Sequence, residues 1–257
     1  MRSIWKGQVG FGLISVPCKL YGACDDKKIS FHQIHAECGS RISMPRWCPK
    51  CERKVEGTEI KKGYEVGDGL VLLDEGDFAS LPLKTLKQVE VVCFTKDSPD
   101  PRAYDEAYYL APDKGGDKPF ALLHQTMKKL GVKAIGKLAY RDREHICVVS
   151  PFDGVMLLQT LHWADEIRPA DEIKPSMVAL SEKELQLGET LIGQMIGVFA
   201  HASFHDDYRQ ALEALVTAKV EGKALASPAE TPVASGDLVS QLLASLGIKE
   251  METANVT

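Results

Sequence analysis

The sequence contains no long run of apolar residues. No stretch approaches the roughly 20 apolar residues that a helix needs to cross a bilayer, and residues 1–7 contain no apolar segment of a signal peptide. Hydrophobic residues make up 44% of the 257 positions and charged residues 26%, which is typical of a globular protein and excludes the disordered and collagen-like classes. We therefore expect a cytoplasmic protein with no membrane partner.

The number of cysteines is odd, so they cannot all be paired in disulfides within one chain. The sequence has seven and shows no secretory signal, which argues against a disulfide framework. We interpret the cysteines as reduced thiols or metal ligands. Isolated thiols and histidines are more often packing residues than site residues, and we assign that role to Cys18, Cys24, Cys93, Cys147, His124, His145 and His162.

Complete catalytic motifs are absent as well. Residues 131–137 match most of a phosphate-binding loop, but Leu138 has no hydroxyl for Mg²⁺, and the segment leads from a helix to a strand instead of the reverse. His201 and His205 lie four residues apart without the glutamate of a zinc-protease helix, and no nucleophile elbow is present. The sequence predicts that the protein is not an enzyme.

Acidic residues exceed basic ones, but the two are unevenly distributed. The net charge is −5, whereas residues 1–62 carry 12 Lys and Arg against 6 Asp and Glu, and residues 119–150 carry 6 against 2. Residues 63–118 and 151–257 are acidic. Two basic segments in an acidic chain suit a protein with a basic nucleic-acid surface, although solvated faces of ordinary proteins vary in the same way.

The first two-thirds of the chain has the pattern of strands. Residues 4–21 contain β-forming residues broken by glycines, and further short β-forming segments lie at 89–94, 107–110, 134–140, 145–149 and 155–159. One helix is expected between Pro119 and Gly131, with Phe120, Leu123 and Met127 at helical spacing. Many short strands with Gly-rich turns predict a β-barrel, in a fold of the α+β class that is mainly β.

The character of the sequence changes to helical after Pro175. Ser181 and Glu184 form a capping box before apolar residues that continue at helical spacing to Phe199, and a second helix is expected from about 206 to 221. The domains we predict are a barrel core at 1–175, a helical region at 176–225, a Pro/Ala/Ser linker at 226–236 and a short helical segment at 237–257. Asp237 caps this last helix, and Gly247 ends it.

Two pairs of residues within segment 32–56 have the spacing of zinc ligands. His35 and Cys38 form one pair and Cys48 and Cys51 the other, which gives a nitrogen and three sulfurs for a closed tetrahedral site. Such a site is structural, because no position is left for an activated water. His32 is an alternative to His35. The other interpretations are a redox Cys-x-x-Cys motif, which lacks its βαβ context, and buried small thiols, which leave the paired spacing unexplained.

Ordered motifs along almost the whole chain resemble those of bacterial Ku, the family of DNA end-binding proteins of non-homologous end joining. They include RSIWKG at residues 2–7, FGL at 11–13, VP at 16–17, ISFHQIH at 29–35, CGSRI at 38–42, KGYE at 62–65, YYLAPD at 108–113, AIGK at 134–137, REH at 143–145 and ADEIR at 164–168. Many relatives end in a long Lys-rich tail, whereas the residues up to Thr257 are nearly neutral, so the resemblance does not extend to tail-dependent bridging or threading of DNA. Some relatives lack the cysteines, so the zinc prediction depends on the four residues themselves.

The resemblance implies a β-barrel from which a bridge extends, two copies of which close into a ring around double-stranded DNA. Such a homodimer would sit at the nucleoid and contact phosphates without reading bases. From the basic segments, the candidate DNA-binding residues are Arg41, Arg46, Lys133, Lys137, Arg141 and Arg143. The last helix resembles the element that engages ligase D, through an apolar face with no obvious cover in the chain, made of Leu238, Val239, Leu242, Leu243 and Leu246. The alternative is that this face folds back onto the chain's own helical region, which the length of the linker permits.

Two other function classes fit parts of this pattern. A zinc-ribbon regulator would bind a particular DNA sequence, whereas a Ku-like ring would need a free end. A hydrolase would carry a compact polar constellation in a pocket.

Overall fold

The computed structural model describes residues 1–81, 85, 87–141, 143–176, 178–223 and 237–247. The chain divides into two compact units, Met1–Pro169 and Ala170–Thr257. The predicted linker at 226–236 and the last ten residues, 248–257, lie outside the described residues. No helix in the described ranges combines the length and the apolar character needed to cross a membrane.

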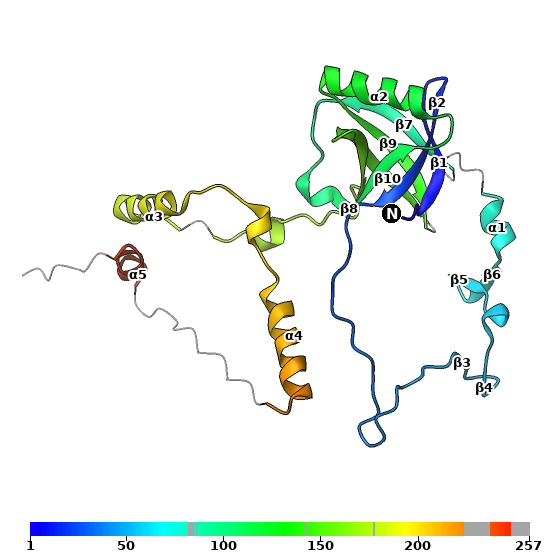
Figure 1. Ribbon diagram of the computed structural model, residues 1–257, viewed down its shortest axis with the longest axis horizontal. Helices are drawn as coiled ribbons and strands as arrows, with labels where there is room; N and C mark the ends of the chain where they lie inside the picture. Colours follow the sequence, from blue (N-terminus) through cyan, green and yellow to red (C-terminus); the bar gives the residue numbers. More distant parts are fainter. Residues whose placement is uncertain (82–84, 86, 142, 177, 224–236, 248–257) are drawn as a thin grey trace, which may run out of the picture. The chain divides into compact units, whose positions relative to one another are not determined.

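Seven strands of the first unit form a closed barrel (Figure 1). They are β1 (Trp5–Phe11), β2 (Ile14–Gly22), β7 (Gln88–Thr95), β8 (Tyr104–Pro112), β9 (Lys133–Tyr140), β10 (Arg143–Phe152) and β11 (Val155–Leu161). Their order around the barrel is β1-β2-β8-β11-β10-β9-β7. All neighbours are antiparallel except β1 and β7, which are parallel and close the barrel. The prediction of a mainly β barrel is confirmed.

Alternate residues of the strands face the barrel interior and form the core. On β9, for example, Ala134 and Leu138 are buried, whereas Lys133 and Lys137, each directly before one of them, are partly exposed. Helix α2 (Asp117–Leu130) lies over the strands and completes this core with three buried side chains, Phe120, Leu123 and Met127 (Figure 1). The helix ends at Gly131, whose φ of 64° is left-handed, as the sequence predicts.

One glycine of the barrel permits a close approach of two backbones. A Cβ atom at Gly136 of β9 would lie 2.6 Å from the carbonyl oxygen of Glu90 on β7. The register between these strands shifts between Val91 and Cys93, which draws the two backbones together here. This contact explains the glycine in the AIGK motif, because no side chain fits at that position.

The residues between β2 and β7 form small, largely exposed elements. They include two hairpins, one of β3 (Trp47–Cys48) and β4 (Arg53–Lys54) and one of β5 (Lys62–Val66) and β6 (Gly69–Leu73). Helix α1 (Glu75–Ala79) follows, and 3-10 turns lie at Gly57–Glu59 here and at Pro101–Ala103 before β8. The predicted zinc segment occupies the first part of this region.

The second unit contains three helices in its described residues. They are α3 (Glu182–Met195), α4 (Asp207–Val220) and α5 (Leu238–Ser245), and 3-10 turns lie at Asp171–Ile173 and His201–Ser203. The predicted caps Ser181 and Asp237 each accept a backbone N–H bond, and Asp206 caps α4 in the same way at the predicted start of that helix, so these three helix starts are confirmed. The extension of the first helix to Phe199 is wrong, because Ile196 adopts an extended conformation and ends α3.

Candidate nucleic-acid interface and metal site

His35 and Cys38 lie together in a tight turn. The backbone N–H of Gly39 donates to the carbonyl oxygen of His35 over 2.9 Å, and that of His35 donates to Ser40 over 2.9 Å. This turn brings His35 Nδ1 within 3.1 Å of Cys38 Sγ. Hydrogen bonds from Ser40 and then from His35 lower the pKa of the Cys38 thiol to about 7, which favours the thiolate that a metal would bind.

Cys48 and Cys51 lie together at the small β3–β4 hairpin. The backbone N–H and the thiol of Cys51 hydrogen-bond to Cys48 and lower the pKa of the Cys48 thiol. The same contact raises the pKa of the Cys51 thiol. The left-handed backbone of Glu52, with a φ of 48°, turns the chain directly after this pair.

The two pairs are formed separately. Within the described ranges, no three His, Cys, Asp or Glu side chains converge closely enough to hold a metal ion. Each pair nevertheless has its two donor atoms side by side, and one nitrogen with three sulfurs is a donor set that zinc prefers. The donor atoms are of the kind that zinc binds. A four-ligand site would require the His35–Cys38 pair and the Cys48–Cys51 pair to approach each other, so this site stays a prediction.

Four of the six predicted DNA-binding residues lie on β9, on β10 or in the turn between them, and each already has a polar partner. Lys133 Nζ donates to Ser98 Oγ over 2.8 Å. Lys137 Nζ lies 3.6 Å from a carboxylate oxygen of Glu144 and 5.5 Å from the ring centroid of Trp163. The cations are therefore held by the protein, and a phosphate would compete with these partners.

Arg143 pairs with a carboxylate, Glu166, that a backbone hydrogen bond also holds in place. Its guanidinium donates to Glu166 Oε1 over 3.2 Å, while Glu166 Oε2 accepts the backbone N–H of Trp163 over 2.9 Å. This backbone bond is the main cause of the lowered pKa of Glu166, and Arg143 and His162 add to it. The ADEIR motif thus supplies the carboxylate that orients the arginine of the REH motif.

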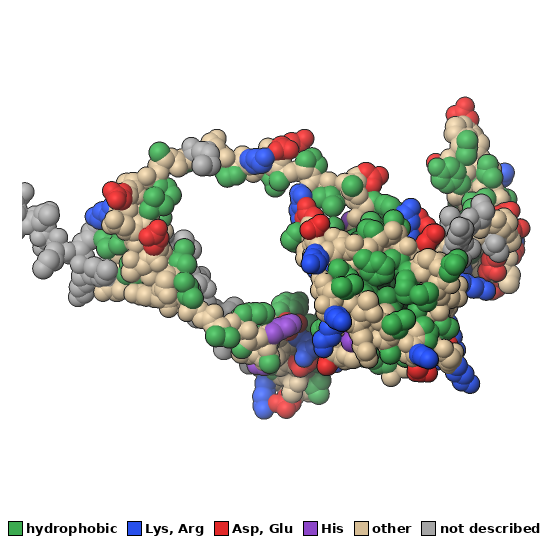
Figure 2. Space-filling view, turned by 90° about the horizontal axis from the view of Figure 1, so that it is seen from above, with side chains coloured by type: hydrophobic (Ala, Val, Ile, Leu, Met, Phe, Trp, Pro, Cys, Tyr) green, Lys and Arg blue, Asp and Glu red, His purple; other side chains and the backbone are tan. Residues whose placement is uncertain are grey.

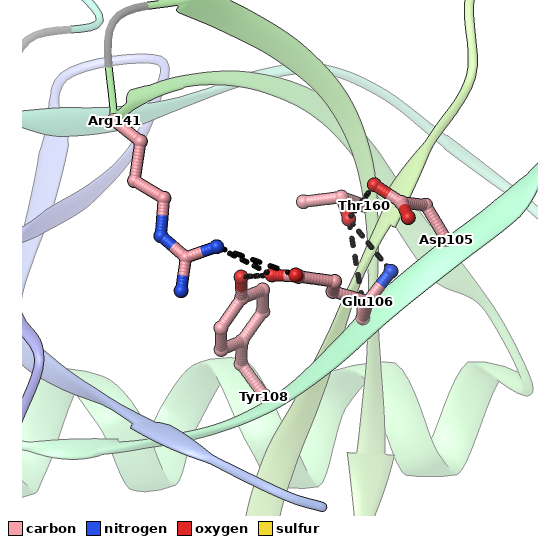
Figure 3. A network of polar contacts seen from close by, with 5 residues as sticks. All are labelled: Asp105, Glu106, Tyr108, Arg141 and Thr160. Atoms are coloured by element: carbon pink, nitrogen blue, oxygen red, sulfur yellow. Dashed lines mark hydrogen bonds and ion pairs between the residues drawn. The ribbon is translucent and has the colours of Figure 1, made fainter. Parts of the chain in front are cut away.

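Arg141 reaches from the β9–β10 turn toward Glu106 at the start of β8 (Figure 3). Its guanidinium lies 3.3 Å from Glu106 Oε1, and the same carboxylate accepts the hydroxyl of Tyr108. Beside it, the buried Thr160 hydroxyl donates to Asp105 Oδ2 and accepts the backbone N–H of Glu106. These contacts tie the turn to the end of the barrel.

The other two predicted DNA-binding residues, Arg41 and Arg46, lie in the insertion between β2 and β7. Arg41 pairs with Ile34 in an isolated antiparallel bridge, and the carbonyl oxygen of Arg46 accepts the N–H of Val55 over 3.0 Å. Both side chains are exposed. The structure thus places the six residues on two separate parts of the chain and does not test their contact with DNA.

The carboxylates that pair with Arg141 and Arg143 could not be identified from the sequence. Glu106 lies 35 residues from Arg141, and Glu166 lies 23 residues from Arg143, so no local spacing marks either pair. The order of the strands brings Glu106 to Arg141, and the turn after β11 brings Glu166 to Arg143. The balance of charge at the barrel end is consequently closer to neutral than the basic segments predict.

Helix α5 has the predicted apolar face, but that face is partly covered. Leu238 is 49% exposed, whereas Val239, Leu242, Leu243 and Leu246 are half-buried, and α3 contacts α5. The expectation that nothing in the chain covers this face is wrong. Leu187 and Leu191 of α3 are also half-buried, so two amphipathic helices shield one another.

A family model described as the Ku70/Ku80 β-barrel domain matches residues 10–187. Proteins named "Non-homologous end joining protein Ku" are similar along most of the chain. The one from Symbiobacterium thermophilum is 35% identical over 99% of this chain, which spans 65% of that relative's length. The one from Archaeoglobus fulgidus is 37% identical over 87% of this chain and 90% of its own length. The one from Mycobacterium tuberculosis is 33% identical over 99% of this chain and 97% of its own. With its closed barrel and these matches, the chain belongs to the Ku β-barrel family.

Proposed function

We propose that this protein binds the ends of double-stranded DNA in non-homologous end joining and catalyses no reaction itself. The observation that carries the proposal is the match of a Ku family model to the closed barrel, together with relatives named for end joining. The chain spans 65% of the length of one relative and 90% of the length of another. No observation favours a sequence-specific regulator.

Binding independent of sequence would come from cations that contact phosphates. Lys137, Arg141 and Arg143 are each paired with a carboxylate at the surface, where ion pairs contribute little and exchange readily. A phosphate can therefore replace the carboxylate as the partner of each cation. Arg41 and Arg46 of the insertion would add contacts of the same kind. Such contacts fix the protein on the duplex and make its affinity depend strongly on salt.

A second copy of the chain is the partner that best explains the exposed apolar side chains of the helical unit. Ile196, Val198 and Phe199 after α3 are all more than two-thirds exposed, as are Tyr208 and Val220 on α4. Large exposed apolar surfaces mark interfaces, and most soluble oligomers are symmetric homodimers. The barrel adds an apolar pocket of about 330 Å³ between α2 and the strands, on a face where Figure 2 shows hydrophobic side chains gathered. We infer a homodimer that closes around DNA.

Zinc would have a structural role in this protein. His35, Cys38, Cys48 and Cys51 would hold it, and a closed shell of four ligands supplies folding free energy without an open position for chemistry. The metal would join the turn at His35 to the β3–β4 hairpin. This link suits a region of short, exposed elements with little core of its own.

Recruitment of ligase D would use helix α5. Its apolar face already packs on α3, so docking on the ligase would replace a contact within the chain. A short amphipathic helix is marginal alone, and exchanging one apolar partner for another of similar area changes the free energy little. Leu238, Val239, Leu242, Leu243 and Leu246 are the residues that the ligase would contact.

The test of end binding compares linear and circular DNA of one sequence. We expect labelled linear duplex to stay bound in the presence of excess closed circular competitor, because a ring needs a free end to load. Equal competition by circular and linear DNA would refute the proposal. Preference for one sequence, independent of ends, would support the regulator instead.

A further inference from the structure

A polar pocket of about 340 Å³ opens at the end of the barrel where β8 begins and where β9 turns into β10. Its volume is within the range of small-molecule sites. Two arginines, two carboxylates, two tyrosines and one histidine line it: Arg141, Arg143, Asp105, Glu106, Tyr108, Tyr140 and His145. The proposed contacts with phosphates use only the two arginines, so the rest of the pocket is unexplained.

His145 is the member of the pocket that points to a ligand. Its side chain is 9% exposed, and its Nδ1 atom has no hydrogen-bond partner among the residues that the structure describes. Burial, with Arg143 nearby, lowers the pKa of His145, so the ring is neutral at pH 7. A buried polar atom without a partner costs free energy, so packing alone does not explain a histidine at this position.

The charges in the pocket favour an uncharged ligand. Two arginines balance two carboxylates among the described lining residues, and the neutral histidine adds no charge. A phosphate would face Asp105 and Glu106, and a cation would face both arginines. A ligand with hydrogen-bond donors beside acceptors can satisfy both signs at once.

The walls of the pocket favour a planar ligand. The guanidinium carbon of Arg141 lies 5.0 Å from the ring centroid of Tyr140, so the planar cation stacks on an aromatic ring. Tyr108 packs edge-on against the same ring at 5.7 Å. Guanidinium planes and aromatic rings are the surfaces on which proteins stack unpaired bases.

We propose that this pocket receives a single unpaired nucleobase, and guanine best of all. Guanine presents O6 and N7 acceptors, which arginine recognises, beside N1 and N2 donors, which carboxylates accept. Arg141 or Arg143 would donate to O6 and N7 of the base, and Glu106 would accept from N1 and N2. The imidazole of His145, which lines the pocket, would supply a further polar contact to the base. The base comes either from a frayed or overhanging DNA end, which depends on the proposed function, or from a free nucleoside.

The first experiment uses free guanosine and needs no DNA. We expect guanosine to shift the ring signals of His145 in the NMR spectrum of the wild-type protein, with adenosine shifting them less. The His145→Asn variant assigns those signals. Binding of guanosine without any effect of DNA overhangs would identify a free nucleoside as the source of the base.

The second experiment compares blunt duplexes with duplexes that carry one unpaired dG at the 3′ end. We expect the overhang to increase affinity roughly tenfold, the factor that one bidentate base contact commonly provides. His145→Leu should remove that gain and leave blunt-end affinity unchanged, and His145→Asn, which keeps a polar group near Nδ1, should restore part of it.

The two proposals fail in different ways. If blunt ends bind but neither guanosine nor the overhang affects His145, the pocket proposal is overturned. If blunt ends do not bind at all, the proposed function fails, and the guanosine titration still decides the pocket. Should His145→Leu not fold, the NMR titration of the wild-type protein decides alone.

Discussion

The pairing of Arg143 with Glu166 leads to a prediction in which removing a carboxylate strengthens DNA binding. In Glu166→Gln the side chain keeps its shape and an oxygen for the backbone N–H of Trp163. It loses the charge that holds Arg143 at 3.2 Å. If Arg143 contacts a phosphate, that contact no longer competes with an internal partner, and affinity for DNA should rise.

The size of the effect follows from the exposure of the pair. Arg143 and Glu166 are about half and about one-third exposed, so solvent and salt already weaken their attraction. We expect a gain of less than about fivefold at low salt, in keeping with the small strength of surface pairs. Arg143→Ala should do the opposite and reduce the slope of log affinity against log salt by about 0.9, the value for one phosphate contact.

The assay measures the affinity of the protein for a short blunt-ended duplex at a series of salt concentrations. Asp171→Asn is the matched control, because it frees Lys174 from an ion pair in the helical unit, and neither residue is among the proposed DNA contacts. That control should leave both affinity and slope unchanged. If Glu166→Gln and Arg143→Ala also leave the slope unchanged, Arg143 does not contact DNA.

Four further predictions address the other parts of the proposal. Metal analysis of purified protein should find close to one zinc per protomer, and Cys48→Ser should lower that content; protein with no zinc would refute the site. Light scattering at micromolar concentration should give a dimer, and a monomer that retains DNA fully would contradict ring closure. Leu242→Asp should abolish stimulation of ligase D in a ligation assay while end binding persists, whereas weaker DNA binding without the ligase would assign α5 to the core. Gly136→Ala should destabilise the barrel by about 1–3 kcal/mol in denaturant unfolding, because its Cβ would lie 2.6 Å from the Glu90 carbonyl oxygen, and an unchanged midpoint would show that the strands can separate.

The barrel and its covering helix could be predicted because their signals are local. Alternating burial along β9 and most of β11 follows from residues two apart, and Gly131 ends α2 by its own backbone conformation. The end of α3 shows the limit of such reasoning. Apolar spacing continues to Phe199, yet Ile196 is extended and Gly197 follows it. Periodicity indicates which face is apolar and does not determine where the helix ends.

The candidate site could be predicted only where its residues are neighbours in the sequence. The pairs His35–Cys38 and Cys48–Cys51 form within single turns, but their joining depends on the path of the chain between them. The prediction that His145 is a packing residue agrees with its burial, since its side chain is 9% exposed. That prediction missed the pocket, whose other walls come from β8 and from the β9–β10 turn. Contacts between strands far apart in sequence leave no mark in a single sequence.

The parallel pairing of β1 with β7 has a consequence for folding and for variation among relatives. Gln8 and Gln88 hydrogen-bond across this seam although 80 residues separate them, so the seam closes only after the whole insertion has been made. Non-local pairings of this kind form slowly, and we expect the seam to be the last part of the barrel to form. The cost of closing a loop rises only with the logarithm of its length, by about 0.6 kcal/mol for each doubling. The insertion can therefore gain or lose residues at little expense to the barrel, which leaves the segment with the cysteine pairs free to diverge while the strands that flank it stay constant.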